Sequence, residues 1–235
     1  MSRPLVVVSS CPQLRTAYLT ETISRLEEEG AYAFPRMLLA DGVVWPALIP
    51  AGWTMVCNGA ERLSVRNNLW AAFRHAVDRD SSRLLYFEDD VIPCLNAVER
   101  MATITIPDDC SLITFHDTKE HAPNTARGLY RHDPYGDDGQ GFCGCQAMAI
   151  PRRMLDYLIT CDPFTVWKSL PQKHGDQVLG YFIDKSPWPR FATHVPSLVK
   201  HVGEVSIAHP SAPLSTRRGT VNFAGDRFDA LGLTF

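Results

Sequence analysis

The sequence feature that most constrains the fold is an apolar run, Leu84 to Phe87, that ends in three adjacent carboxylates, Glu88 to Asp90. A run in which every side chain is apolar predicts a strand that is buried on both faces of a sheet. Three adjacent acids repel one another and are costly to bury unless a cation or hydrogen-bond donors balance their charge. Carboxylate oxygens suit Mg²⁺ and Mn²⁺, and ligands of open α/β sheets bind beyond the carboxyl ends of the strands. The run therefore predicts a metal site, and the competing interpretation is a solvated acidic turn that ends at Pro93.

The length and composition are those of an ordinary globular domain. The chain has 235 residues, of which 45% are hydrophobic and 21% are charged, and this predicts one domain with a sizeable core. The net charge of −3 predicts no strong general attraction to nucleic acid or anionic lipid. We find no apolar run of membrane-spanning length and no signal peptide, so we expect no membrane partner. The odd count of seven cysteines, five of them scattered singly, does not form a disulfide pattern and favours a reducing, cytoplasmic location.

Strands and helices are predicted to alternate along the chain. Hydrophobic patterns predict strands at 5–10, 34–39, 53–56, 84–87 and 111–117, and another that ends near 150. They predict helices at 16–29, within 59–78, at 97–101, at 152–160 and from 174 onward. This order is typical of an α/β fold. Between 118 and 138 the pattern dissolves into a segment rich in Pro, Gly and acids, which predicts a long loop of the kind that forms lids or binding loops.

Two polar clusters are candidates for contact with a nucleotide. Ser9, Ser10 and Arg15 follow the first predicted strand, and the carboxyl end of such a strand is where a nucleotide can lie. Arg66 and Asn67 stand near the start of a later helix, where cationic and amide groups can hold a base or a phosphate. The alternatives are a simple connecting loop for the first cluster and a capped, solvated helix end for the second.

Three further candidates lie later in the chain. A glycine-spaced turn that includes Gly144 precedes an apolar strand, and its glycines allow either close approach of a ligand or an ordinary bulge. Asp176 stands in the first turn of a helix, where a carboxylate is either an N-cap or a catalytic base. His201 follows an apolar run and precedes a turn that contains Gly203, and it is either a metal ligand or a satisfied polar residue.

The order of these parts resembles the GT-A class of glycosyltransferases. In that class a strand of the nucleotide-binding half ends in a DxD-like acidic motif, and a glycine-bearing segment, a helix-start acid and a C-terminal His follow. The matching parts here are the acids 88–90, the segment 141–146, Asp176 and His201. The resemblance implies an α/β GT-A fold, in which a Rossmann-like nucleotide-binding half with a central, mostly parallel sheet is fused to a smaller acceptor half. It implies one catalytic domain over 1–235, with the nucleotide-sugar-binding half at about 1–95, the acceptor half at 96–210 and a C-terminal tail at 211–235.

The resemblance also implies residue roles. Asp90 and His201 would bind Mn²⁺ or Mg²⁺, Glu88 and Asp89 would hold the ribose or a metal-bound water, and a UDP-sugar would be the donor. Asp176 would take the proton from the acceptor hydroxyl, which implies inversion, although retention stays open. Asp117, Asp137 and Asp138 remain alternative bases. The further candidates for contact with the nucleotide sugar are Ser9, Ser10, Arg15, Arg66, Asn67 and Gly144.

The string Pro196 to Gly203 is similar to a Pro-x-Leu-Val-x-His-x-Gly pattern of small, often phage-borne glycosyltransferases. Some of these enzymes glycosylate hydroxymethylated pyrimidines in DNA, so the resemblance implies a base such as 5-hydroxymethylcytosine in bacteriophage DNA as the acceptor. A protein or a small glycoside is the alternative acceptor. A metal-dependent nucleotidyl- or phosphotransferase and a non-catalytic nucleotide-sugar binding module also stay open. The basic residues that would form a DNA-contacting rim are Lys168, Lys173, Lys200, Arg217, Arg218 and Arg227.

Overall fold

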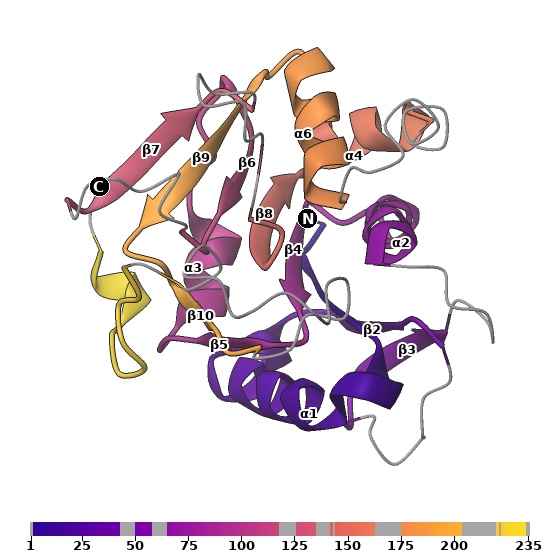
Figure 1. Ribbon diagram of the computed structural model, residues 1–235, viewed down its shortest axis with the longest axis vertical. Helices are drawn as coiled ribbons and strands as arrows, with labels where there is room; N and C mark the ends of the chain where they lie inside the picture. Colours follow the sequence, from indigo (N-terminus) through magenta and orange to yellow (C-terminus); the bar gives the residue numbers. More distant parts are fainter. Residues whose placement is uncertain are drawn as a thin grey trace, which may run out of the picture.

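The protein is built around one eight-stranded sheet (Figure 1). The computed structural model describes residues 2–42, 50–57, 65–117, 126–134, 142, 144–162, 175–203, 220 and 222–233, with the backbone alone for 12–14, 65 and 66. The strands are β1 (Leu5–Ser10), β2 (Arg36–Ala40), β3 (Trp53–Cys57), β4 (Arg83–Glu88), β6 (Cys110–Thr114), β7 (Gly128–His132), β8 (Ala147–Pro151) and β9 (Arg190–Val195). Their order in space is β3-β2-β1-β4-β8-β6-β9-β7.

Most strands of this sheet point the same way. Strands β3, β2, β1 and β4 are parallel neighbours. Strand β8 runs antiparallel to both β4 and β6, so β6 has the direction of β4, and β9 pairs parallel with β6. Strand β7 is antiparallel to β9 at the edge of the sheet. The expected α/β architecture with a mostly parallel central sheet is therefore confirmed.

Helices cover both faces of the sheet (Figure 1). Helices α1 (Pro12–Glu28) and α3 (Ala97–Thr103) pack on one face, and α2 (Val65–Asp78), α4 (Arg152–Thr160) and α6 (Gly175–Lys185) pack on the other. Along β4, Leu85 and Phe87 enter the first core, whereas Leu84 and Tyr86 enter the second. Each such side chain contributes roughly 1.5–3 kcal/mol when it is fully buried. Burial on both faces explains why the run before the acids is apolar without interruption.

A second, two-stranded sheet pairs β5 (Val91–Pro93) with β10 (Val199–His201) in antiparallel fashion. Strand β5 follows β4 directly after Asp89 and Asp90. Strand β10 follows β9 after a cis peptide bond between Val195 and Pro196. Two short 3₁₀ helices, η1 (Ala31–Ala33) and η3 (Ala230–Gly232), complete the described elements. This small sheet joins the segment after the acids to the segment that carries the C-terminal histidine.

The polar ends of several elements lie together at the carboxyl ends of the parallel strands, a side of the main sheet that is called its polar edge. The carboxyl ends of β1, β4, β6 and β9 lie along this edge because the four strands share one direction. Helices α2 and α6 each lead into one of these strands through a short connection, residues 79–82 and 186–189. Both helices therefore end near the amino ends of the strands that follow them, as α6 does at the start of β9 in Figure 1, and they begin toward the opposite, polar side. This is the edge where α/β proteins place their ligands.

One prediction about the elements is wrong. The segment 118–138 does not lack secondary structure throughout, because Gly128–His132 forms the edge strand β7. Its side chains are only partly buried, so the sequence carries no apolar pattern there; residues 118–125 and 135–138 lie outside the described part. Helix α1 has an additional first turn from Pro12, where proline is favoured, and its regular part follows the kink at Arg15, in agreement with the helix expected from about 16. None of the helices in the described ranges combines the length and the apolar character needed to cross a membrane.

Candidate metal centre

The three acids lie at the junction between β4 and β5. Asp89 and Asp90 are 3% and 1% exposed, and Glu88 is half-buried. Thr22 of α1 donates its hydroxyl to the backbone carbonyls of Asp89 and Val91 and accepts a hydrogen bond from the Val91 amide. These bonds fix the turn against the helix. The solvated acidic turn is therefore wrong, and the charge of the acids has to be balanced within the protein or by a ligand.

The pairing of β5 with β10 brings His201 to the acids. His201 stands opposite Val91 in this pair, and the Val202 amide donates to the Asp90 carbonyl at 2.9 Å. The His201 Nε2 lies 3.0 Å from the Asp90 Oδ2, although 110 residues separate the two in the sequence. The histidine and the acids of the sequence prediction therefore meet at one point.

Arg15 and Ser10 contact the same acids. The Arg15 guanidinium donates to the Asp89 Oδ1 at 2.9 Å and to the Asp90 Oδ2 at 2.5 Å. Ser10 donates its hydroxyl to the other oxygen of Asp89 at 2.6 Å. Both residues were expected to contact the nucleotide from the end of β1. In the structure both contact the acids, which gives Asp89 a donor on each of its oxygens, and the Arg15 guanidinium also lies over the Tyr18 ring.

Glu88, Asp90 and His201 form a group with the chemistry of a divalent-cation site. One donor atom from each of the three lies within 4.8 Å of the others. The Asp90 Oδ1 is buried and accepts no hydrogen bond within the described residues. A buried carboxylate oxygen without a donor is costly, and a cation removes that cost. Two carboxylates and an imidazole fit Mn²⁺, and also Mg²⁺ when water completes its shell.

Burial and neighbouring charges shift the pKa values of Glu88, Asp90 and His201. Burial raises the pKa of Glu88 to about 8, and the negative charge of Asp90 adds to the rise. Burial also tends to raise the pKa of Asp90, but the hydrogen bond and charge of His201 and the ion pair with Arg15 outweigh it and leave that pKa below its usual value. Burial tends to lower the pKa of His201, but the hydrogen bond and charge of Asp90 raise it above its usual value. Without a divalent cation, a protonated His201 and an ionised Asp90 stabilise each other.

Gly203 explains how the chain after β10 passes so close to Asp90. A Cβ atom at this position would collide with the Asp90 Oδ2 and would lie 2.9 Å from the Asp90 Cγ and 3.2 Å from an Arg15 nitrogen. Only a residue without a side chain therefore fits between the backbone and the carboxylate. In the sequence, Gly203 stands out only as a member of the Pro196–Gly203 string and of the turn after His201. The short H-x-G spacing is the signal that could have assigned it this role.

The remaining nucleotide candidates take different positions. Ser9 hydrogen-bonds Tyr86 within the core that faces α2. Gly144 has φ +147°, and a Cβ there would lie 2.7 Å from the Thr114 Oγ1, so its described role is close packing. Asn67 is half-buried in the first turn of α2, at the polar edge of the sheet. The Arg66 side chain lies outside the described part of the chain.

Asp176 lies in the first turn of α6, which begins at the same polar edge. Its carboxylate accepts a hydrogen bond from the Gln177 amide at 2.8 Å, as an acid at a helix start does. Among the alternative bases, Asp117 is fully buried at the end of the β6 segment and accepts from the Asn222 amide. Asp137 and Asp138 lie outside the described residues, as do Lys168, Lys173, Arg217 and Arg218.

Two residues near the acids had no clear signal in the sequence. Thr22 looks like an ordinary position on the inner face of α1, yet it fixes the backbone around Asp89. His116 follows β6, and its ring lies 6.0 Å from that of His201 in an edge-on arrangement. Neither could be found from spacing, because their partners are distant in the sequence.

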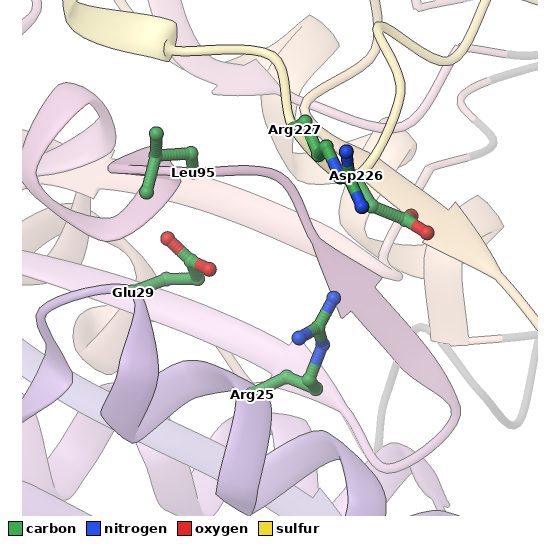
Figure 2. Close-up of a pocket in the computed structure, with 5 residues that line it drawn as sticks. All are labelled: Arg25, Glu29, Leu95, Asp226 and Arg227. Atoms are coloured by element: carbon green, nitrogen blue, oxygen red, sulfur yellow. The ribbon is translucent and has the colours of Figure 1, made fainter.

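A separate pocket of about 450 Å³ lies at the other end of α1 (Figure 2). Arg25 of α1 and Glu29 directly after this helix face Asp226 and Arg227 of the C-terminal segment across it, with Leu95 beside them. Two positive and two negative side chains line this pocket, so it favours no ligand charge. The Glu29 carboxylate also accepts a hydrogen bond from the Asn96 amide. The acids, and not this pocket, therefore form the candidate site.

The fold is that of the GT-A glycosyltransferases. The chain is similar to the galactosyltransferase LgtC in complex with donor and acceptor sugar analogs, with a TM-score of 0.50 and 12% identity over 84% of this chain and 86% of LgtC. It is similar to an active-site mutant of LgtC, with a TM-score of 0.54 and 12% identity over 91% and 93% of the two chains.

A third similar structure is the apo form of the glycosyltransferase GlyE from Streptococcus pneumoniae TIGR4, with a TM-score of 0.50 and 12% identity over 79% of this chain. The chain spans 44% of GlyE, which is less than half its length. No protein-family model matches the sequence, and no curated protein matches it. At 12% identity these likenesses establish the fold, and the site has to be argued from this chain's own residues.

Proposed function

We propose that the protein is a metal-dependent glycosyltransferase that moves a sugar from a UDP-sugar to a hydroxyl acceptor. The observation that carries this proposal is the group of Glu88, Asp90 and His201 at the carboxyl edge of a GT-A sheet, with the Asp90 Oδ1 buried and without a hydrogen-bond donor in the described part. In this proposal the first half of the domain, at about 1–95, binds the nucleotide sugar, and the second half, at 96–210, binds the acceptor.

The residues at the acids would each do a defined task. Asp90 and His201 would hold Mn²⁺ or Mg²⁺, and Glu88 would complete the shell or hold a metal-bound water. A divalent cation there supplies positive charge to the diphosphate that leaves the sugar. Asp89 keeps its two oxygens on Ser10 and Arg15 and would stabilise the turn rather than the cation. The proposed contacts of the nucleotide sugar remain Ser9, Ser10, Arg15, Arg66, Asn67 and Gly144.

Asp176 is the proposed base for the acceptor hydroxyl. The start of α6 lies at the polar edge, and a general base in that position contributes about 10²- to 10⁴-fold to the rate. Direct attack by the deprotonated hydroxyl would invert the anomeric carbon. Asp117 is the described alternative, but its complete burial and its bond to the Asn222 amide make it the weaker candidate.

The finer proposal for the acceptor is a hydroxymethylated base in DNA, which rests on the Pro196–Gly203 string. Lys200 and Arg227 are the exposed members of the expected basic rim within the described residues. A sugar acceptor is the second candidate, because LgtC was crystallised with an acceptor sugar analog. The six described cysteines carry free thiols, which favours the reducing cytoplasm as the proposed location.

Two measurements test this function. Calorimetry of UDP binding with and without Mn²⁺ should show metal-dependent affinity that Asp90→Ala abolishes and that Asp156→Ala, an exposed acid paired with Arg152, leaves intact. Unchanged Mn²⁺-dependent affinity in Asp90→Ala would contradict the metal assignment. A screen of UDP release from UDP-sugars, against hydroxymethylated DNA, unmodified DNA and simple glycosides, then identifies donor and acceptor. Release that no acceptor stimulates would argue against transfer.

The base has its own test. Asp176→Asn should keep the affinity for UDP-sugar and lower transfer by about 10²- to 10⁴-fold. Asp184→Asn, on the same helix and paired with Lys185, is the matched control and should keep the wild-type rate. Near wild-type turnover in Asp176→Asn would move the base to another residue.

A further inference from the structure

Arg15 is held in an unusual place on α1. Its backbone has φ −133° and ψ 25°, which is not helical and kinks the helix after its first turn. The guanidinium of this residue reaches the acids, and the Arg15 side chain is only 12% exposed. A break in the helix costs backbone hydrogen bonding, so the contact that it permits is expected to repay that cost. That contact is the double ion pair with Asp89 and Asp90.

The two carboxylate oxygens of Asp90 differ in their hydrogen-bond partners. Its Oδ2 accepts from both Arg15 and His201. Its Oδ1 is buried and has no hydrogen-bond donor within the described ranges. All described cationic contacts with Asp90 therefore fall on one oxygen, and the other is left for a further ligand.

A positive charge already lies beside the candidate site. One donor atom from each of Glu88, Asp90 and His201 lies within 4.8 Å of the others, and the Arg15 guanidinium donates to the Oδ2 of Asp90. A cation that enters would meet this charge at short range in a poorly solvated setting, where repulsion is strong.

We propose that Arg15 is an internal counter-cation that competes with the divalent metal ion for Asp90, so that it holds the acids together in the metal-free protein and weakens metal binding. This inference rests on the proposed metal-dependent function, and assigns Arg15 a role at that site other than contact with the nucleotide. The opposing interpretation is that Arg15 only positions Asp90. The two interpretations predict opposite signs when the charge is removed.

The experiment is Mn²⁺ binding to the nucleotide-free protein, measured by calorimetry. Arg15→Met keeps most of the side-chain length but removes the charge, and it should bind Mn²⁺ at least about tenfold more tightly than the wild type. Arg15→Lys keeps the charge and should stay within about threefold of the wild type. Arg25→Met, on the same helix with an ion pair to Glu28, controls for the general loss of a positive charge and should change nothing.

A second measurement covers loss of stability in Arg15→Met. If Mn²⁺ replaces the missing charge, saturating Mn²⁺ should raise the melting temperature of Arg15→Met more than that of the wild type. A variant that is unfolded without metal should regain its fold when Mn²⁺ is added. Combining Arg15→Met with Asp90→Ala should remove both effects, which shows that the ion sits at Asp90.

The outcomes separate this inference from the proposed function. Tighter Mn²⁺ binding in Arg15→Met supports competition. Equal or weaker binding, or a smaller thermal shift than in the wild type, overturns competition and leaves the metal site intact. If wild type and Arg15→Met both fail to bind Mn²⁺, even with UDP present, the metal-dependent function itself is wrong and this inference falls with it.

Discussion

Gly203→Ala tests the geometry of the candidate site with a single added methyl group. The new Cβ would collide with the Asp90 Oδ2 and lie 2.9 Å from the Asp90 Cγ, whereas ordinary contacts begin at 3.4 Å. Asp90 cannot yield easily, because it is 1% exposed and Arg15 and His201 hold its Oδ2. Either the carboxylate rotates away from its partners or β10 moves away from β5.

The expected cost is that of an overpacked core, about 1–3 kcal/mol in the free energy of unfolding. Urea denaturation with a fluorescence readout measures this difference, and calorimetry measures Mn²⁺ binding in the same variant. We expect Mn²⁺ affinity to fall by at least about tenfold, because about 1.4 kcal/mol of ligand displacement already has that effect. Both changes follow from one collision.

Gly232→Ala is the matched control for this substitution. No atom lies within 4 Å of a Cβ at Gly232, and its φ is not in the left-handed region. We expect its stability to stay within about 0.5 kcal/mol of the wild type. If Gly203→Ala were equally stable and bound Mn²⁺ normally, the close approach of the β10 segment to Asp90 would be refuted.

Two further predictions concern stability. Thr22→Val should lower the free energy of unfolding by about 1–3 kcal/mol in urea denaturation, because the buried backbone groups of Asp89 and Val91 lose their hydroxyl partner. Thr20→Val, at an exposed position of the same helix, should lower it by less than about 1 kcal/mol. Equal costs for the two variants would contradict the anchoring role of Thr22. Burial lowers the pKa of His194 from 6.5 to about 4, so the unfolded chain takes up a proton first as pH falls. The free energy of unfolding should therefore decrease as the pH falls from about 6.5 to 4, by up to about 3 kcal/mol for this residue. In His194→Gln, the free energy of unfolding should decrease less between pH 7 and pH 4.5 than it does in the wild type. A pH dependence that is identical in wild type and His194→Gln would show that the ring is not buried in the neutral form.

Local pattern was enough to predict most elements that carry the site. The strand before the acids was predicted because Leu84 to Phe87 face two cores, and burial on both faces leaves an uninterrupted apolar run in the sequence. The same reasoning predicted β1 and the helices before β4 and β9. It failed for β7, because an edge strand with partly buried side chains has no apolar pattern and is defined by its pairing with β9.

The site residues also fall into those that the sequence could identify and those that it could not. The acids could be identified as a site from the sequence, since three adjacent carboxylates between apolar residues need compensation wherever they lie. The partners of the acids could not be derived from local pattern. Arg15 was expected to contact a nucleotide, and its ion pairs with Asp89 and Asp90 depend on a kink in α1 that no spacing reveals.

The sequence by itself determined that this is an α/β protein with acids at the end of its central strand, because hydrophobic period and local charge are properties of neighbouring residues. The family resemblance implied that His201 joins those acids, and only the tertiary structure decided how distant residues reach them. The antiparallel pairing of β5 with β10 places His201 at Asp90, and the shared direction of β4 and β9 places the start of α6 at the same edge. Strand register and direction depend on contacts between segments about a hundred residues apart, and these contacts leave no periodic trace in either segment.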